Sequence, residues 1–148
     1  MNKFEESLNN ILVDTFNFIL KYEEMSLQKF LHVPVTITEA HMIDAMAKEE
    51  KTTVSKLASL LEIAIPTATV AAKKMEKKGF IQKTPCEKDA RRTILSLTET
   101  GQKIARGHRL FHEKMVRHIS RQFEETEKDV LLRAVNTLSE FFKAKVEI

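Results

Sequence analysis

Residues 53–101 constrain the fold most. A helical pattern, a proline, a second helical pattern and a glycine follow one another there in that order. Residues 54–61 carry leucines at helical spacing, which predicts a short helix. After a short turn, Pro66 suits the start of a second helix, where its missing N–H costs nothing. That second helix should run to Lys78, with Gly79 as its C-cap. The leucines expected to face inward from the first helix are Leu57, Leu60 and Leu61.

A basic hairpin follows this pair of helices. Residues 80–84 and 93–97 favour two antiparallel strands, and the polar residues 85–92 favour the turn between them. The whole order predicts a winged helix-turn-helix. Residues 51–92 also hold ten basic and four acidic side chains, a net charge of +6 in a chain whose total is +3. A cationic surplus confined to one segment favours a surface that binds a polyanion, although many charge runs are only solvated.

Helical patterns flank the winged segment on both sides. Apolar side chains recur at helical spacing over residues 3–30, and Pro34 should end that long helix. Thr38 is a candidate N-cap for a helix over residues 39–48. Beyond the hairpin, Thr98 should cap a helix that reaches about Gln122.

The chain should end in one more helix. Thr126 with Asp129 three residues later resembles a capping box at its start. The fold class predicted is therefore mainly α with a small β-hairpin wing. We expect a single domain over residues 1–148, in which segments 1–34 and 99–148 are dimerisation helices and segment 35–98 is the winged helix-turn-helix.

Composition excludes several classes of protein. With 43% hydrophobic and 30% charged residues, the chain should be globular, and no apolar run is long enough to span a membrane. The N-terminus lacks the pattern of a signal peptide, so the cytoplasm is the expected location. Three glycines form no phosphate-binding loop and no nucleophile motif is present, which predicts neither an enzyme nor a cofactor. The one cysteine, Cys86, rules out an intrachain disulfide.

Two stretches of the winged segment resemble the MarR family of bacterial transcriptional regulators. Asp89-x-Arg91, followed by Leu95-Ser96-Leu97-Thr98-x-x-Gly101, is similar to the wing signature of that family. Residues 75–81 are similar to the end of its recognition helix and its first wing strand. The resemblance implies a homodimer whose terminal helices intertwine and hold two winged domains over a pseudo-palindromic operator in double-stranded DNA. It also implies a regulator of transcription, with repression as the expected mode.

By the same resemblance, the helix over residues 66–78 enters the major groove and the wing enters the minor groove. Arg91 and Arg92 suit the narrow, strongly negative minor groove, and Asp89 should pair with an arginine to hold the tip. The side chains expected to contact phosphates are Lys73, Lys74, Lys77 and Lys88. Those expected to approach base edges are Pro66, Thr67, Thr69 and Val70, which favour methyl contacts with thymine and hence an A·T-rich site.

The histidines leave the nature of an effector open. His108 and His112 lie four residues apart on one helical face, and His41 could approach them from another helix, with Glu24 or Glu113 completing a zinc site. A zinc-sensing branch of the family resembles this arrangement. The alternative is a histidine pair that is only solvated or hydrogen-bonded, which is the more common situation.

A second resemblance favours a lipid effector. The stretch His41-Met42-Ile43-Asp44 and the pattern His108-x-x-Phe111-His112-x-x-Met115-Val116 are similar to the branch of the family that represses fatty-acid synthesis genes. This implies an acyl chain, delivered by acyl carrier protein, as corepressor. An apolar pocket for it could be lined by Phe16, Leu20, Met42, Met46 and Phe111, for which simple core packing is the alternative.

Overall fold

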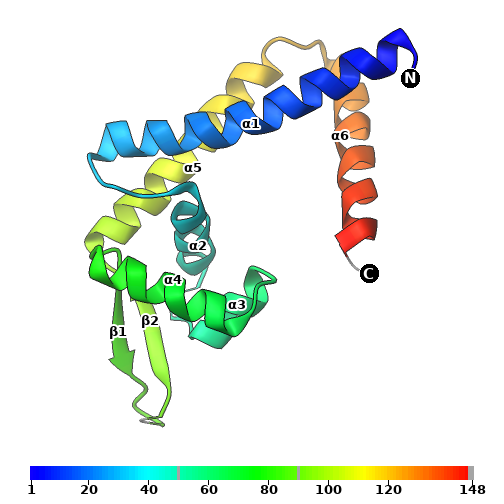
Figure 1. Ribbon diagram of the computed structural model, residues 1–148. Helices are drawn as coiled ribbons and strands as arrows, with labels where there is room; N and C mark the ends of the chain where they lie inside the picture. Colours follow the sequence, from blue (N-terminus) through cyan, green and yellow to red (C-terminus); the bar gives the residue numbers. More distant parts are fainter. Residues whose placement is uncertain (50, 90, 147–148) are drawn as a thin grey trace. The chain divides into compact units, whose positions relative to one another are not determined.

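The computed structural model of the protein describes residues 1–49, 51–89 and 91–146 (Figure 1). It divides into two compact units, Met1–Phe111 and His112–Ile148. Ala90 of the predicted wing and the last two residues of the predicted domain lie outside the described residues. The fold is mainly helical with one two-stranded hairpin, which confirms the predicted fold class.

The first two helices begin at reciprocal caps. Helix α1 (Lys3–Leu31) starts at Asn2, whose side chain accepts from the Glu5 N–H while the Glu5 carboxylate accepts from the Asn2 N–H. Helix α2 (Ile37–Ala47) starts in the same way at Thr36, paired with Glu39. The predicted cap at Thr38 was therefore wrong, because a capping box needs an acidic residue three positions later and only Thr36 has one.

The helix-turn-helix consists of α3 (Val54–Leu60) and α4 (Ile65–Lys77), whose axes bend by 112° at the turn. Glu62 supplies a left-handed residue in that turn, with φ 53°. Leu57 is fully buried as predicted, but Leu60 is 47% exposed and Ala58 takes the second buried position of α3. Gly79 follows α4 with φ 78°, the conformation that its C-terminus requires.

The wing is the antiparallel pair β1 (Ile81–Pro85) and β2 (Thr93–Leu97), which extends as a separate arm below α4 (Figure 1). Its register pairs Ile81 with Leu97 and Lys83 with Leu95. The first strand begins one residue later than predicted, because the Phe80 N–H bonds to the Met75 carbonyl at the end of α4.

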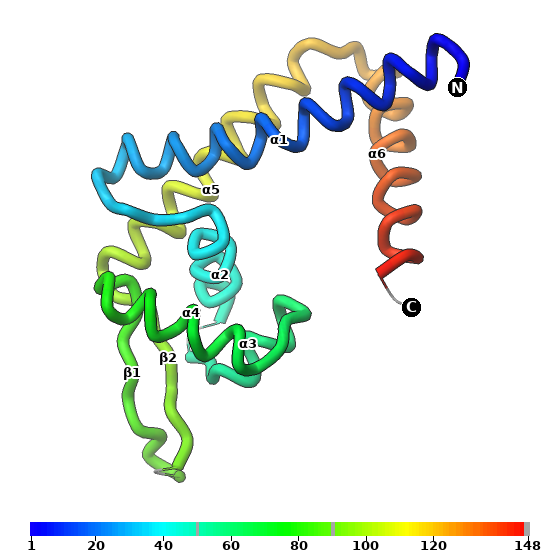
Figure 2. Tube along the Cα trace, viewed as in Figure 1, coloured from blue at the N-terminus to red at the C-terminus, as the bar shows by residue number. Residues whose placement is uncertain are grey.

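Helix α5 (Glu99–Ser120) follows the wing in the chain and packs against the long helix α1. The part of α5 in the first unit runs beside α1 (Figure 2). Gly107 of α5 lies against α1, since a Cβ at that glycine would be 3.3 Å from Leu27 and 3.4 Å from Leu31. One core ties these elements together in the first unit. Its largest fully buried side chains include Ile43, Met46, Leu57, Met75, Phe80, Ile81, Leu95 and Ile104.

The second unit contains the end of α5 and helix α6 (Glu125–Val146), which has no buried side chain among its described residues. Helix α6 begins before Thr126, so the predicted capping box at that residue was wrong. Instead, the Glu124 N–H, just before the helix, donates to the Glu127 carboxylate three residues later at 2.8 Å. Among the described residues no single helix is long and apolar enough to cross a membrane; the bent pair α3 and α4 reaches that composition only when both helices are counted together.

Candidate nucleic-acid interface and histidine cluster

Helix α4 buries one face and exposes a face of mixed character. Ala68, Ala72 and Met75 are fully buried, and their small or flexible side chains let the helix lie close to its neighbours. The exposed side chains on the C-terminal half include Lys73, Lys74 and Lys77, together with Glu76, whose carboxylate lies 3.0 Å from the Lys83 ammonium group. On the N-terminal half, Pro66, Thr67 and Val70 are exposed and Thr69 is half-buried. The predicted DNA-contacting residues of α4 are thus accessible to a large ligand.

The N-terminus of α4 lacks a side-chain cap. Ala64 occupies the N-cap position and makes no side-chain hydrogen bond, as its methyl group requires. Pro66, in the first turn, removes one of the four N–H groups that would need a partner. The remaining N–H groups and the positive end of the helix dipole favour an anion such as a phosphate.

The wing tip is shaped by one aspartate. The Asp89 carboxylate accepts a hydrogen bond from the Arg91 backbone N–H at 3.0 Å, and the Arg92 N–H donates to the Asp89 carbonyl at 2.9 Å. The predicted partner of Asp89 is an arginine, and in the structure the Asp89 carboxylate bonds to the backbone N–H of Arg91. Lys88, Arg91 and Arg92 are all exposed around this turn, so the tip presents three cations.

Thr98 and Gly101 fix the wing to α5. The Thr98 hydroxyl lies 2.6 Å from the Gly79 carbonyl oxygen and 3.0 Å from that of Phe80, and it accepts from the Gly101 N–H at 3.2 Å. A Cβ added to Gly101 would lie 2.1 Å from the Phe80 carbonyl oxygen, far inside van der Waals contact. The spacing Thr98-x-x-Gly101 therefore has a structural reason. It allows the start of α5 to pack closely against the residues that follow α4.

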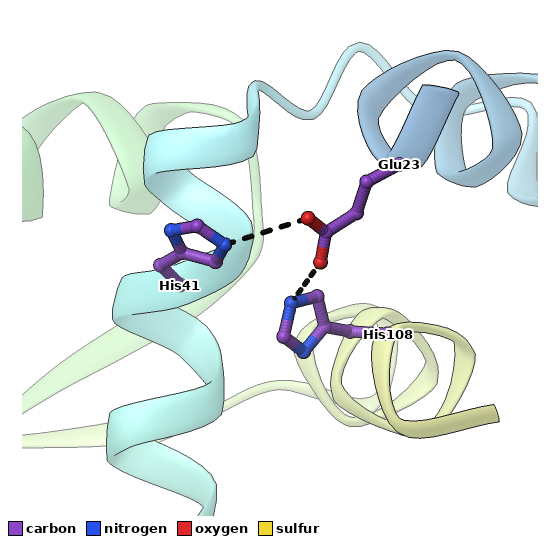
Figure 3. A group of neighbouring side chains, drawn as sticks. All are labelled: Glu23, His41 and His108. Atoms are coloured by element: carbon purple, nitrogen blue, oxygen red, sulfur yellow. Dashed lines mark ion pairs between the residues drawn. The ribbon is translucent and has the colours of Figure 1, made fainter. Parts of the chain in front are cut away.

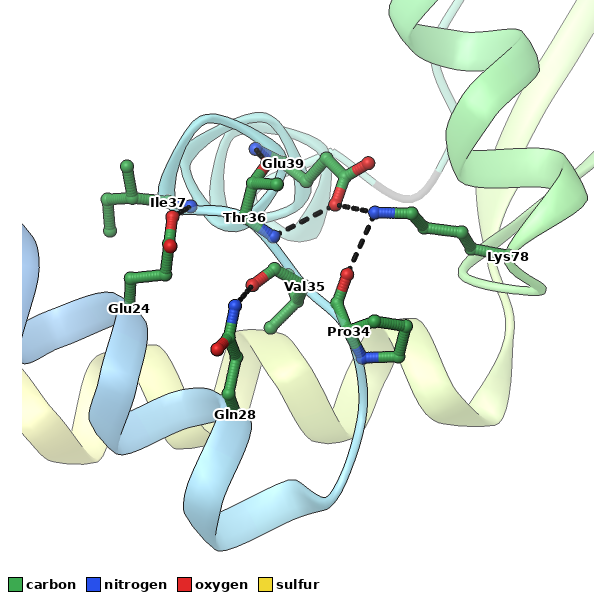
Figure 4. A network of polar contacts seen from close by, with 8 residues as sticks. All are labelled: Glu24, Gln28, Pro34, Val35, Thr36, Ile37, Glu39 and Lys78. Atoms are coloured by element: carbon green, nitrogen blue, oxygen red, sulfur yellow. Dashed lines mark hydrogen bonds and ion pairs between the residues drawn. The ribbon is translucent and has the colours of Figure 1, made fainter.

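Lys78 has a role that sequence reasoning missed. Its ammonium group lies 2.9 Å from the Glu39 carboxylate and donates to the Pro34 carbonyl at 2.8 Å (Figure 4). Glu39 is 7% exposed and also closes the cap at Thr36. Unlike the exposed lysines of α4, Lys78 thus ties the end of that helix to the start of α2. No local sequence signal separates it from its neighbours.

A histidine cluster joins three helices of the first unit. Glu23 of α1 lies between His41 of α2 and His108 of α5 (Figure 3). Its two carboxylate oxygens lie 2.5 Å from His108 Nε2 and 3.7 Å from His41 Nε2. His108 Nδ1 lies 3.6 Å from the Asp44 carboxylate. The Glu23 side chain is 1% exposed, and a carboxylate at that depth needs such partners.

The carboxylate of this cluster is Glu23, whereas the predicted zinc site named Glu24. Glu24 points to the start of α2, where it accepts the Ile37 N–H at 2.7 Å (Figure 4). The two side chains diverge because successive residues of a helix are rotated by about 100°. One ligand atom from each of Glu23, His41 and His108 lies within 4.8 Å of the others, a grouping that could hold a metal ion. His112 follows one turn later on α5, at the start of the second unit.

The residues predicted for an acyl pocket lie at different depths. Met42 and Met46 are core residues, 4% and 2% exposed, whereas Phe16 and Leu20 are about half exposed on α1. Phe111 is half-buried, with its ring centroid 5.7 Å from that of Tyr22. Of the five, Met42 borders an open groove of about 630 Å³ between α2 and α4.

Both terminal helices expose more apolar surface than their own unit covers. On α1, Phe4, Phe18 and Phe30 are 72%, 66% and 77% exposed. On α6, Phe141 and Phe142 are 58% and 51% exposed. Large apolar patches on soluble proteins mark surfaces that meet a partner.

Comparison with known proteins identifies the family. Residues 35–93 match the MarR family. The chain is 31% identical to Streptococcus pneumoniae FabT in its crystal structure with DNA, with a TM-score of 0.85 over 95% of this chain and 98% of that one. It is 30% identical over 109 residues to the transcriptional regulator AdcR of Streptococcus pneumoniae serotype 2, covering 72% of this chain and 74% of that protein. The AdcR structure from Streptococcus pyogenes, 28% identical, has a TM-score of 0.66 over 95% of this chain and 98% of that one. The chain therefore belongs to the MarR family of winged-helix, DNA-binding transcriptional regulators, which are not enzymes.

Proposed function

We propose that this regulator is a repressor that binds a pseudo-palindromic operator as a homodimer. The observation that carries the proposal is the similarity to a FabT molecule bound to DNA, which extends over 95% of the chain. It is supported by the position of the net +6 segment, residues 51–92, which forms the helix-turn-helix and the wing. Neutralising phosphates with these side chains releases counterions and favours binding.

In this proposal α4 lies in the major groove and the wing in the minor groove. Lys73, Lys74 and Lys77 contact phosphates and position the helix. Arg91 and Arg92, held by the Asp89 turn, enter the minor groove, where the negative potential is strongest. The uncapped N-terminus of α4 adds main-chain donors for a phosphate.

The dimer in this proposal is formed by the terminal helices. The exposed phenylalanines of α1 and α6 supply the apolar surface, and symmetric pairing is the commonest way to cover it. A dimer would carry two recognition helices related by a two-fold axis, which matches a palindromic site.

For the effector, we propose an acyl chain presented by acyl carrier protein, as in a FabT-type repressor of fatty-acid synthesis genes. The proposal rests on the resemblance of residues 41–44 and 108–116 to that branch and on the two methionines of α2. Met42 and Met46 lie in the core, where flexible thioether side chains can repack around an inserted chain. Phe16, Leu20 and Phe111 would complete the lining.

Zinc is the second candidate effector, and the Glu23, His41 and His108 cluster favours it. Two imidazoles and one carboxylate are a ligand set that zinc accepts, and the predicted ligand His112 lies four residues after His108 in the sequence. Binding a metal would replace the 2.5 Å contact between Glu23 and His108, so the ion must compensate for that loss.

Native mass spectrometry of the untreated protein distinguishes these effectors, because a retained lipid and a bound zinc ion differ in mass. Operator affinity should then be measured with zinc, with chelator, and with acyl carrier protein carrying long acyl chains. A shift with the loaded carrier supports the lipid. A shift with zinc that chelator reverses, and none with the carrier, would replace the lipid by the metal. Absence of salt-dependent binding to any duplex would refute the DNA-binding proposal itself.

A further inference from the structure

The N-terminal half of α4 has an unusual surface for a helix that reads DNA. Its first six residues, 65–70, are Ile-Pro-Thr-Ala-Thr-Val, so only two side chains there carry a hydrogen-bonding group. Val70 is 54% exposed and Pro66, four residues earlier on the same side of the helix, is also exposed. Together Pro66 and Val70 form an exposed apolar strip of α4 along the open groove between α4 and α2.

The hydroxyl of Thr69 is already engaged within the helix. It donates to the Ile65 carbonyl oxygen, one turn earlier, at 2.9 Å. In this state it cannot also donate to the N7 and O6 acceptors of guanine or the O4 acceptor of thymine. The other branch at Cβ, the methyl group, is left for contact with a ligand. The hydroxyl oxygen can therefore only accept a hydrogen bond from a base, and the methyl group is the apolar surface that Thr69 offers to DNA.

From these observations we infer that Thr69 and Val70 determine sequence specificity by contacting the C5-methyl groups of thymines. The inference rests on the proposed function, in which α4 lies in the major groove. The thymine methyl is the one apolar feature that unmodified base pairs present there, and side-chain methyl groups suit it. The lysines of the C-terminal half supply affinity without reading sequence, so discrimination falls on the N-terminal half, where these methyl groups lie.

The inference predicts that the protein distinguishes thymine from uracil in otherwise identical DNA. Deoxyuridine pairs with adenine as thymidine does but lacks the C5-methyl group. Burying one methyl is worth about 0.8 kcal/mol, which corresponds to about a fourfold change in affinity for each contacted thymine. Thymines outside the contact should show no change.

The test starts from a duplex selected by the protein itself out of a random-sequence DNA pool. Each thymine of the selected duplex is replaced singly by deoxyuridine, and Kd is measured for the parent protein and for four variants. Thr69→Val keeps the methyl surface and removes the hydroxyl, whereas Thr69→Ser does the reverse. Val70→Ala removes the second methyl surface. Lys73→Ala serves as the matched control on the same exposed face.

We expect Thr69→Val to retain the preference for thymine, and Thr69→Ser and Val70→Ala each to lose it at one or two positions. Lys73→Ala should weaken thymine and uracil duplexes by the same factor. Equal affinity of the parent for all uracil duplexes would overturn the inference while leaving DNA binding intact. A preference that survives unchanged in both Thr69→Ser and Val70→Ala would assign the effect to DNA shape and would equally overturn it. Failure to select any duplex would instead refute the proposed function.

Discussion

Removing Glu23 should destabilise the first unit far more than removing its neighbour Glu24. The Glu23 side chain is 1% exposed and His108 8% exposed, so Glu23→Ala leaves the imidazole without its closest partner at a buried site. Breaking a buried pair from one side costs about 3–5 kcal/mol. Asp44 remains 3.6 Å from His108 Nδ1 and compensates in part, which places the expected loss near the lower limit, about 3 kcal/mol. Glu24→Ala removes one hydrogen bond to the Ile37 N–H, a loss of about 1 kcal/mol.

Urea unfolding followed by circular dichroism measures these losses, since the chain has one tyrosine and no tryptophan for fluorescence. Protein concentration is held fixed because dimer formation affects apparent stability, and chelator is present so that no metal contributes. The double variant Glu23→Leu and His108→Leu should return to within about 1 kcal/mol of the parent, because replacing both partners by apolar groups leaves no buried charge. Equal losses for Glu23→Ala and Glu24→Ala would refute this account of the cluster.

Three further predictions concern DNA binding, assembly and the wing. Arg91→Ala should weaken binding to A·T-rich duplexes most, while Lys73→Ala should weaken all sequences alike and reduce the slope of log K against log salt by about 0.9, as gel-shift titrations at several salt concentrations would reveal. Glutamates at both Phe141 and Phe142 should yield a monomer or an unfolded chain in analytical ultracentrifugation, because paired apolar surface cannot bury charges without partners; an unchanged dimer would contradict the proposed interface. Gly101→Ala should lower the melting temperature and DNA affinity together, since its Cβ would lie 2.1 Å from a carbonyl oxygen, and a normal melting curve would show that the contact relaxes freely.

Most of the helix-turn-helix and wing could be predicted because their signals are local. Pro66 marks the first turn of α4, Gly79 marks its end, and the alternation of residues 93–97 matches β2 without a shift. The N-cap of α2 could likewise have been predicted at Thr36 instead of Thr38, because Thr36 is the threonine with a glutamate three residues later. In each case the deciding interaction spans fewer than six residues.

The choice between Glu23 and Glu24 could not be predicted from the sequence. Helix α1 carries apolar residues on several sides, so its pattern does not determine which side faces α2 and α5. That rotation depends on packing against residues about 80 positions away, such as Gly107 against Leu27. Lys78 poses the same problem, since its contact with Glu39 joins residues 39 positions apart.

Helix α2 carries His41 of the histidine cluster and also contacts the end of α4, which predicts how an effector influences DNA affinity. His41 faces Glu23 on one side of α2, and at the start of the same helix Glu39 pairs with Lys78, the residue that follows α4 (Figures 3 and 4). A ligand that shifts α2 therefore moves the end of α4 through Lys78.

Lys78→Met should remove this coupling, because its side chain keeps the apolar stem but loses the ammonium group. The test uses whichever ligand, zinc or loaded acyl carrier protein, changes the operator affinity of the parent. The ratio of operator affinities with and without that ligand should fall toward one in Lys78→Met. Lys77→Met, an exposed neighbour, should lower DNA affinity equally with and without the ligand and leave the factor unchanged. Linkage requires that operator DNA change the ligand affinity of the parent by the same factor, which isothermal titration can check. A Lys78→Met protein that is folded and keeps the full factor would exclude α2 and Lys78 as the connection between the two sites.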